Sequence, residues 1–195
     1  RIGWPRADPA GALVPPSGRL QRRAAEAGVA GDARYLRGNY QYQQYVPLNR
    51  QYTLAFNGEL GWGKGMAGRP YPVFKNFYSG GLGSVRGFDQ GTLGPRDVTG
   101  ASIGGPRKVT LNTELITPFP GAGNDRTLRL FGFVDVGNVF GENEPVRAGD
   151  LRASVGVGLS WISPIGPLRL AIANPVRKEA GDRIQKLQFQ IGTSF

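Results

Sequence analysis

The sequence predicts an all-β fold, an antiparallel transmembrane β-barrel of about eight strands. Apolar and polar residues alternate with a period of two along much of the chain, which is typical of strands rather than helices. Several alternating segments are about ten residues long, the length that a tilted strand needs to cross a bilayer, and soluble strands are shorter on average. Short turns also alternate with longer loops. Together these three observations favour a membrane barrel.

Three strands are predicted in the first third of the chain, at residues 19–28, 34–46 and 52–62. The first two alternate weakly and the third regularly, so the third has one apolar and one polar face. Its apolar residues are Tyr52, Leu54, Phe56, Leu60 and Trp62.

Five further strands are predicted in the rest of the chain, at residues 108–115, 128–138, 152–161, 168–174 and 185–195. The segment 152–161 is among the most regular, because small or polar residues separate every pair of apolar ones. Its apolar face consists of Ala153, Val155, Val157, Leu159 and Trp161.

The connections between these strands differ in length according to the end of the sheet. Outer-membrane barrels have short turns at the periplasmic end and longer loops at the other end, which here puts the C-terminus on the short-turn side. Residues 29–33 are shorter and residues 118–125 longer than this pattern requires. The short turns are 47–50 and 163–167, and the long loops are 64–106, 141–149 and 175–183.

A soluble β-sandwich or a lipocalin-like barrel would also alternate. In a soluble barrel, however, the polar face points to water and is usually charged, whereas here it consists mainly of Gly, Ser, Thr, Asn and Gln. Aromatic residues lie near the predicted strand ends, as in the interfacial girdles of membrane barrels. Examples are Tyr52, Trp62, Trp161 and Phe195.

The composition excludes several functional classes. The 195 residues include no cysteine and no histidine, so disulfides, Cys/His zinc sites and histidine-dependent triads are excluded. The formal net charge is +10, but the basic residues are scattered, and the densest cluster, Arg19, Arg22 and Arg23, lacks the recurring aromatic residues of a nucleic-acid surface. We therefore predict no enzymatic activity, no metal or other cofactor, and no nucleic-acid partner.

The loop at residues 64–106 is too long for an ordinary connection, and loops of this length are usually functional or disordered. Its glycine-rich centre lacks the following helix and the Gly-Lys-Ser/Thr ending of a phosphate-binding loop. A mobile surface loop would expose Phe77, Tyr78, Val85 and Phe88 to water, so we expect the loop to pack against the rest of the protein.

The sequence Val85-Arg86-Gly87-Phe88, preceded by Gly80-Gly81 and followed by Leu93-Gly94-Pro95, resembles the long-loop motif of an outer-membrane superfamily. This superfamily comprises the BamA and TamA assembly factors and the two-partner-secretion transporters. The resemblance covers about residues 50–195, and the segment 114–120 favours the BamA branch. Further matching segments, in the family's order, are 112–118, 133–140 and 163–168, together with the terminal Phe195.

The resemblance implies a barrel of about sixteen strands preceded by periplasmic POTRA domains. Residues 1–195 are then expected to be the C-terminal half of that barrel, with a remnant of the preceding strand near residues 2–4 and with the POTRA domains absent from this chain. Half a barrel has two unpaired edges, which have to pair or be covered.

The resemblance also implies that the long loop is locked inside the barrel by an ion cluster, in which Arg86 pairs with Glu114 and Asp135. Strand parity agrees, because both carboxylates lie on the polar faces of their predicted strands. A planar guanidinium has donors for two carboxylates, whereas a lysine does not. The predicted lock consists of Val85, Arg86, Gly87, Phe88, Glu114 and Asp135.

The function implied by the resemblance is that of an assembly factor in the bacterial outer membrane, which folds and inserts nascent barrel proteins through a lateral seam at its last strand. An incoming strand would pair with that edge by β-augmentation. The implied partners are unfolded outer-membrane proteins, assembly-complex lipoproteins and outer-membrane lipid. Gly192 would weaken pairing locally, or serve a simple packing need. The predicted seam consists of Leu187, Phe189, Ile191, Gly192 and Phe195.

Other functions stay open at this point. A TamA-like assembly factor has the same architecture, and a two-partner-secretion transporter would pass an extended polypeptide through the lumen for a single cognate partner. In a small outer-membrane hydrolase, the only candidate catalytic residues would be Glu114, Asp135 and the serines. The absence of histidine counts against this function.

Overall fold

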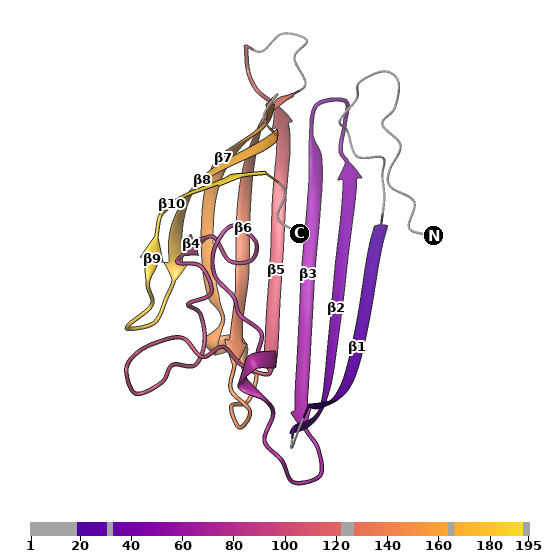
Figure 1. The fold of residues 1–195 in the computed structure, drawn as a ribbon. Coiled ribbons are helices and arrows are strands. Elements are labelled where there is room, and N and C mark those ends of the chain that lie inside the picture. The colour runs from indigo at the N-terminus through magenta and orange to yellow at the C-terminus, as the bar shows by residue number, and fades with distance from the viewer. Residues whose placement is uncertain (1–18, 31–32, 122–126, 164–165, 193–195) are drawn as a thin grey trace.

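The computed structural model describes residues 19–30, 33–121, 127–163 and 166–192. Its main element is one curved antiparallel sheet of eight strands, in the order β1-β2-β3-β5-β6-β7-β8-β10 (Figure 1). A second sheet contains only β4 and β9. The elements are β1 (Arg19–Ala30), β2 (Ala33–Pro47), β3 (Thr53–Gly65), η1 (Val73–Lys75), β4 (Gly87–Phe88), β5 (Arg107–Pro118), β6 (Leu128–Phe140), η2 (Ala148–Asp150), β7 (Arg152–Ser163), β8 (Gly166–Arg177), β9 (Ile184–Gln185) and β10 (Leu187–Ile191).

The predicted all-β antiparallel fold is confirmed, with a main-sheet strand in each of the eight predicted segments. Most strands are longer than predicted, up to 15 residues in β2, because the ladder continues into the residues next to the turns, as with Pro47 opposite Thr53. The last strand differs in the other direction. It was predicted at residues 185–195, but β10 has only five residues, because residues 184–185 leave the main sheet to form β9. Residues 2–4 and Phe195 lie outside the described residues.

The two faces of the sheet differ in the way the alternation predicts. On β6, the rings of Phe131 and Phe133 and the carboxylate of Asp135 are buried on the inner face, whereas Val134 is exposed on the outer face. Val157 on β7 is likewise exposed. An exposed apolar outer face is what a surrounding bilayer would cover. No helix in the described residues is long and apolar enough to cross a membrane.

Small residues on the inner face make room for aromatic rings. The ring of Phe133 lies over Gly156, and the ring of Phe131 lies over Gly158, so a side chain at either glycine would collide with a ring. Phe131 and Phe133 form a core cluster with Ala171 and Ala173 of β8. The glycine-rich alternation of β7 therefore serves packing, because the inner wall has to accept bulky groups from its neighbours.

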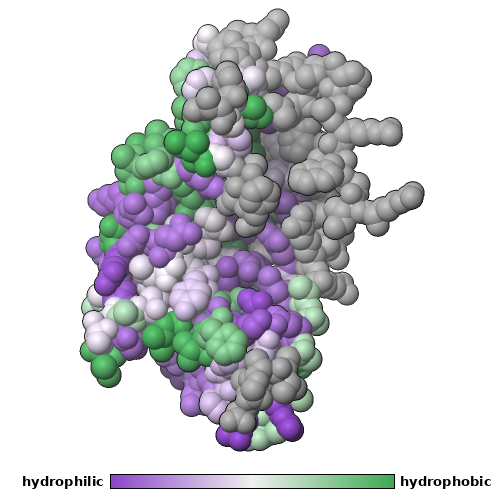
Figure 2. Space-filling view, viewed as in Figure 1, coloured by the Kyte–Doolittle hydropathy of each residue, from purple (hydrophilic) through white to green (hydrophobic). Residues whose placement is uncertain are grey.

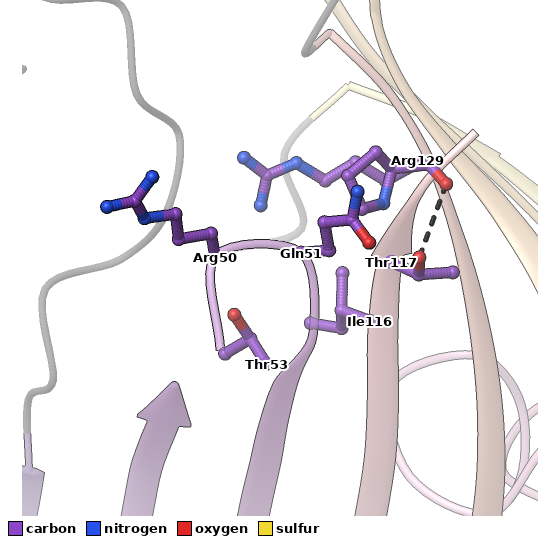
Figure 3. Close-up of a pocket in the computed structure, with 7 residues that line it drawn as sticks. Arg50, Gln51, Thr53, Ile116, Thr117 and Arg129 are labelled. Carbon is purple, nitrogen blue, oxygen red and sulfur yellow. Dashed lines mark hydrogen bonds between the residues drawn. The ribbon is translucent and has the colours of Figure 1, made fainter. Parts of the chain in front are cut away.

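The turn between β2 and β3 is closed by a side chain. The side-chain Oδ1 atom of Asn49 accepts hydrogen bonds from the backbone N–H groups of Gln51 and Tyr52, at 2.8 and 2.7 Å. A pocket of about 40 Å³ lies beside this turn (Figure 3). It has room for no more than a few waters, so we assign it no ligand. Its lining residues are Arg50, Gln51, Thr53, Ile116, Thr117, Pro118 and Arg129.

Candidate functional site

The long loop between β3 and β5 returns across the inner face of the sheet instead of extending away from it (Figure 1). Phe77, Val85 and Phe88 are buried as expected, and so are Tyr71 and Leu93. Tyr78, which was also expected to pack, is 45% exposed, so the expectation is wrong for this residue. The burial of Phe77, Val85 and Phe88 removes apolar surface that would be costly in water.

Arg86 lies at the centre of the loop and is almost completely buried, with 1% of its surface exposed. Its Nε and Nη2 atoms donate to the two carboxylate oxygens of Asp135, both at 2.6 Å. Its backbone N–H donates to the same carboxylate at 3.0 Å. Its Nη1 atom donates to Glu114 Oε1 at 2.5 Å. The guanidinium thus joins the loop to β5 and β6 at the same time.

A second arginine completes the cluster. The Nη2 atom of Arg169, on β8, donates to both oxygens of Glu114, at 2.6 and 2.7 Å. Two arginines and two carboxylates therefore form a neutral group, which reduces the cost of removing the charges from water. The sequence analysis missed Arg169. The alternation of side chains along β8 could have identified it, because Arg169 lies between Leu168 and Leu170 and so points to the inner face.

Two phenylalanine rings form a floor beneath the charged groups. The Cζ atom of Arg86 lies 3.6 Å from the centroid of the Phe133 ring, and Cζ of Arg169 lies 4.6 Å from that of Phe131. Both distances are within the range of cation–π attraction, which is strongest where water is excluded. The aromatic residues of β6 therefore hold both guanidinium groups against the inner face of the sheet.

The charge of Arg86 is stabilised by its partners. Burial by itself would lower the pKa of the guanidinium, but the hydrogen bonds to Asp135 and the negative charges of both carboxylates outweigh it and raise the pKa above its ordinary value. Arg86 is therefore a cation at neutral pH.

The residues flanking Arg86 fix the course of the backbone. Gly87 has a φ of +88°, and a Cβ atom there would lie 3.0 Å from the Ala173 side chain of β8. Only glycine combines this conformation with so close an approach. Val85, Phe88 and Leu93 form a buried apolar cluster. The structure thus brings Val85, Arg86, Gly87, Phe88, Glu114 and Asp135 into one site.

The predicted seam residues lie apart from this site. Leu187, Phe189 and Ile191 are exposed on the outer face of β10, as expected for lipid-facing residues. Gly192 does not lie inside the strand as predicted: it follows β10, has a φ of +87°, and donates its N–H to the Pro167 oxygen at 2.8 Å. The glycine ends the strand, because its left-handed conformation does not fit a ladder. Phe195 lies outside the described residues.

A cavity of about 480 Å³ opens beside the ion cluster, toward β2 and β3. Its lining includes Gln41, Gln43, Asn112, Glu114 and Arg169. In the view of Figure 2, which is the same as that of Figure 1, hydrophilic residues cover much of the middle of the molecule. This polar inner face is typical of a barrel lumen. Within the described residues, no group of three or more His, Cys, Asp or Glu side chains is placed to hold a metal ion.

Comparison with known proteins identifies the family. The Omp85 superfamily domain matches residues 10–195. The chain belongs to the Omp85 superfamily. This result agrees with the loop motif, with the ion cluster and with the eight-stranded antiparallel wall.

Two relatives are named BamA. The outer membrane protein assembly factor BamA of Neisseria meningitidis serogroup B is 36% identical over the whole chain. A crystal structure of BamA from Haemophilus ducreyi lacking POTRA domains 1–3 superposes with a TM-score of 0.83 at 30% identity, over 91% of this chain and 38% of that one. The predicted resemblance to BamA, as part of its barrel, is confirmed.

Similarity extends to eukaryotic proteins. The sorting and assembly machinery component 50 homolog A of Xenopus laevis is 33% identical over 94% of this chain and 42% of its own length. The chain spans 28% of the length of the Neisseria protein. The names of these relatives refer to assembly and not to an enzymatic reaction.

Proposed function

We propose that this chain supplies the C-terminal part of the barrel of an outer-membrane assembly factor, which folds and inserts nascent β-barrel proteins through a lateral seam at β10. The relatives named above support this function, and the membrane-facing strands fit the outer-membrane location that their names give. We further propose, as the resemblance implies, that the complete barrel has about sixteen strands and that POTRA domains precede it.

The observation that carries the proposal is the short final strand. β10 contributes only five residues to the ladder, whereas its neighbour β8 has 12. On its other edge, the described residues contain no strand that pairs with it. Such an edge presents backbone donors and acceptors to an incoming strand, and the outward side chains of Leu187, Phe189 and Ile191 keep it at the lipid boundary.

The proposal implies three kinds of partner. A client would be an unfolded outer-membrane protein, because only a β-strand satisfies the ladder groups of β10 in the absence of water. Outer-membrane lipid would cover the outer face, and lipoproteins of an assembly complex would bind elsewhere on the full-length protein. The ion cluster has a structural role in this proposal and makes or breaks no covalent bond.

The proposal is tested by closing the seam. Cysteines introduced at Gln190 and in the first barrel strand of the full-length protein should abolish client insertion under oxidation, and reduction should restore it. A protein with only the Gln190 cysteine controls for the substitution itself. Insertion at the normal rate with the disulfide intact would overturn edge templating and favour an indirect effect on the bilayer.

A further inference from the structure

We propose that Gln188 couples the locked loop to the seam, as a positioning residue that makes the pairing of β10 depend on the state of Arg86. Gln188 is the buried residue of β10, with 4% of its surface exposed, and its side chain points inward. Its Nε2 atom donates to the Phe88 oxygen at 2.7 Å, and its Oε1 atom accepts from the Gly87 N–H at 3.3 Å. These contacts join residues about 100 positions apart.

The chemistry of a carboxamide explains this choice of residue. It carries one donor group and one acceptor, as a peptide does, so it can bond the N–H and the C=O of a short extended segment. Gly87 and Phe88, which form β4, are such a segment and directly follow Arg86. Gln188 therefore acts as one more rung of ladder between the loop and the final strand.

A second contact supports the same connection. After β8 the chain leaves the sheet, and β9 pairs with β4, with Gln185 opposite Gly87 and Ile184 opposite Phe88. The Asp89 N–H also donates to the Arg183 oxygen at 2.9 Å. Residues 183–185 are thus paired with the loop, and Lys186 returns to the sheet, where its oxygen accepts from the Ala173 N–H at 2.8 Å.

Charged groups extend the connection. Arg96, in the loop, donates to the Gly181 oxygen and lies 3.7 Å from Asp182. Asp182 is also held by Arg152 of β7, at 3.1 Å. The loop is therefore attached to the β8–β10 connection by side chains, by backbone pairing and by Gln188.

This arrangement holds the two ends of the final strand differently. The beginning of β10 is fixed to the loop, which Arg86 fixes to β5 and β6. Toward its end, the strand is held by its pairing with β8 and by the turn at Gly192. Release of Arg86 would loosen the beginning of β10 as well, so the lock would set how readily the seam separates. Only this consequence for the seam rests on the proposed function.

The test compares Gln188 with Gln190, which lies on the same face of the same strand. Gln190 borders the lumen cavity, and among the described residues no hydrogen bond joins it to the loop. Amide hydrogen exchange is measured in the full-length protein, for residues 87–89 and 187–191. Gln188→Leu should raise exchange at residues 87–89 about tenfold, because two hydrogen bonds are lost, whereas Gln190→Leu should leave it within about twofold.

Coupling is measured by adding Arg86→Ala. Arg86→Ala alone should raise amide exchange at residues 187–191 about tenfold. In a protein that already carries Gln188→Leu, adding Arg86→Ala should raise this exchange by only about threefold or less. In a protein that carries Gln190→Leu, Arg86→Ala should keep its full effect. If Gln188→Leu does not fold, Gln188→Asn, which is one methylene shorter, replaces it. An unchanged β10 in Arg86→Ala, or the same effect in the Gln188 and Gln190 variants, would overturn the proposal.

The exchange measurement is independent of client insertion. If the exchange measurements show coupling but the disulfide-tethered protein still inserts clients, only the proposed function would be overturned. If the exchange measurements show no coupling between Arg86 and Gln188 while the disulfide still blocks insertion, only the proposed role of Gln188 would be overturned.

Discussion

The loop lock and the final strand belong to the same wall but are stabilised in opposite ways. At the lock, the side chains of Arg86 and Asp135 are buried, and every charge has a partner at hydrogen-bond distance. At the seam, a five-residue strand exposes three apolar side chains on its outer face. From this contrast we expect the loop to open at a higher free energy than the edge strand β10.

This difference has a physical origin. Removing one partner from a buried ion pair leaves an uncompensated charge and costs about 3–5 kcal/mol. In the proposed function, separating the edge strand would exchange backbone hydrogen bonds, each with a net value of about 1 kcal/mol, for similar bonds with a substrate strand. That function would need both a loop that is costly to release and an edge that exchanges partners at low cost, so that the sheet stays folded while it pairs with clients.

The largest expected effect comes from breaking the lock. Arg86→Ala should destabilise the loop by about 3–5 kcal/mol, and by less if water enters from the adjoining cavity, because Asp135 and Glu114 lose their shared cation. Limited proteolysis of the loop in the full-length protein measures this change. Arg86→Lys should recover only part of the protection, since it cannot bond both carboxylates in the same way.

Arg69 provides a matched control in the same loop, because it is exposed. Arg69→Ala should leave the protection within experimental error. A double-mutant cycle of Arg86→Ala with Asp135→Asn should show strong coupling, and its absence would exclude the pair as the source of the loop's stability.

A smaller effect should distinguish a central strand from the edge. Val157 on β7 and Phe189 on β10 are both exposed on the outer face, by 61% and 72%. Val157→Arg should cost about 2–4 kcal/mol if its site is near the bilayer midplane, because β7 is held on both sides. Phe189→Arg should cost less, because an edge strand can shift its side chain toward the interface.

Unfolding by denaturant in lipid vesicles measures both values. Ser160→Arg is the control on β7, because Ser160 borders the lumen cavity and its replacement should cost less than that of Val157. Equal costs at Val157 and Ser160 would contradict the assignment of the outer face to lipid.

A substitution at Gly87 should have an intermediate effect. Gly87→Ala should cost about 1–3 kcal/mol, because its φ of +88° is strained for any residue with a Cβ atom and the Ala173 side chain is close. The loss should appear as faster proteolysis of the loop. Gly83, where an added Cβ would contact nothing within 4 Å, is the matched control. Similar losses at the two glycines would show that the backbone conformation of Gly87 is not the cause.

Much of the fold and part of the site could be predicted from the sequence. Period-two alternation identified the strand segments, and parity placed Glu114 and Asp135 on the inner face, because the face of a strand is a local property. The loop motif then indicated their partner Arg86. The course of the final strand could not be predicted, because β9 pairs with β4 from a distant part of the chain.

Arg169 and Gln188 show the limit of parity. Both lie at inward positions, but parity does not determine how far a side chain reaches or which loop lies above it. The contacts of Arg169 with Glu114 and of Gln188 with Gly87 depend on how the loop packs in three dimensions. Gly192 shows the same limit for backbone conformation, since its left-handed φ ends the strand that the alternation alone would continue.

The smallest expected effect concerns the second arginine of the lock. The side chain of Arg169 is 37% exposed, whereas that of Arg86 is 2% exposed, although both bind Glu114. Arg169→Ala should therefore cost about 1 kcal/mol or less, because solvent screens the pair and Glu114 keeps Arg86 as its partner. The same proteolysis assay, repeated at low and high salt, measures it. High salt should reduce the effect of Arg169→Ala, since mobile ions reach exposed charges, and should leave the effect of Arg86→Ala nearly unchanged. If the two variants lost equal protection with equal salt dependence, the buried Arg86 and the partly exposed Arg169 would contribute equally to the cluster. The distinction between a buried and a solvent-screened ion pair would then be wrong.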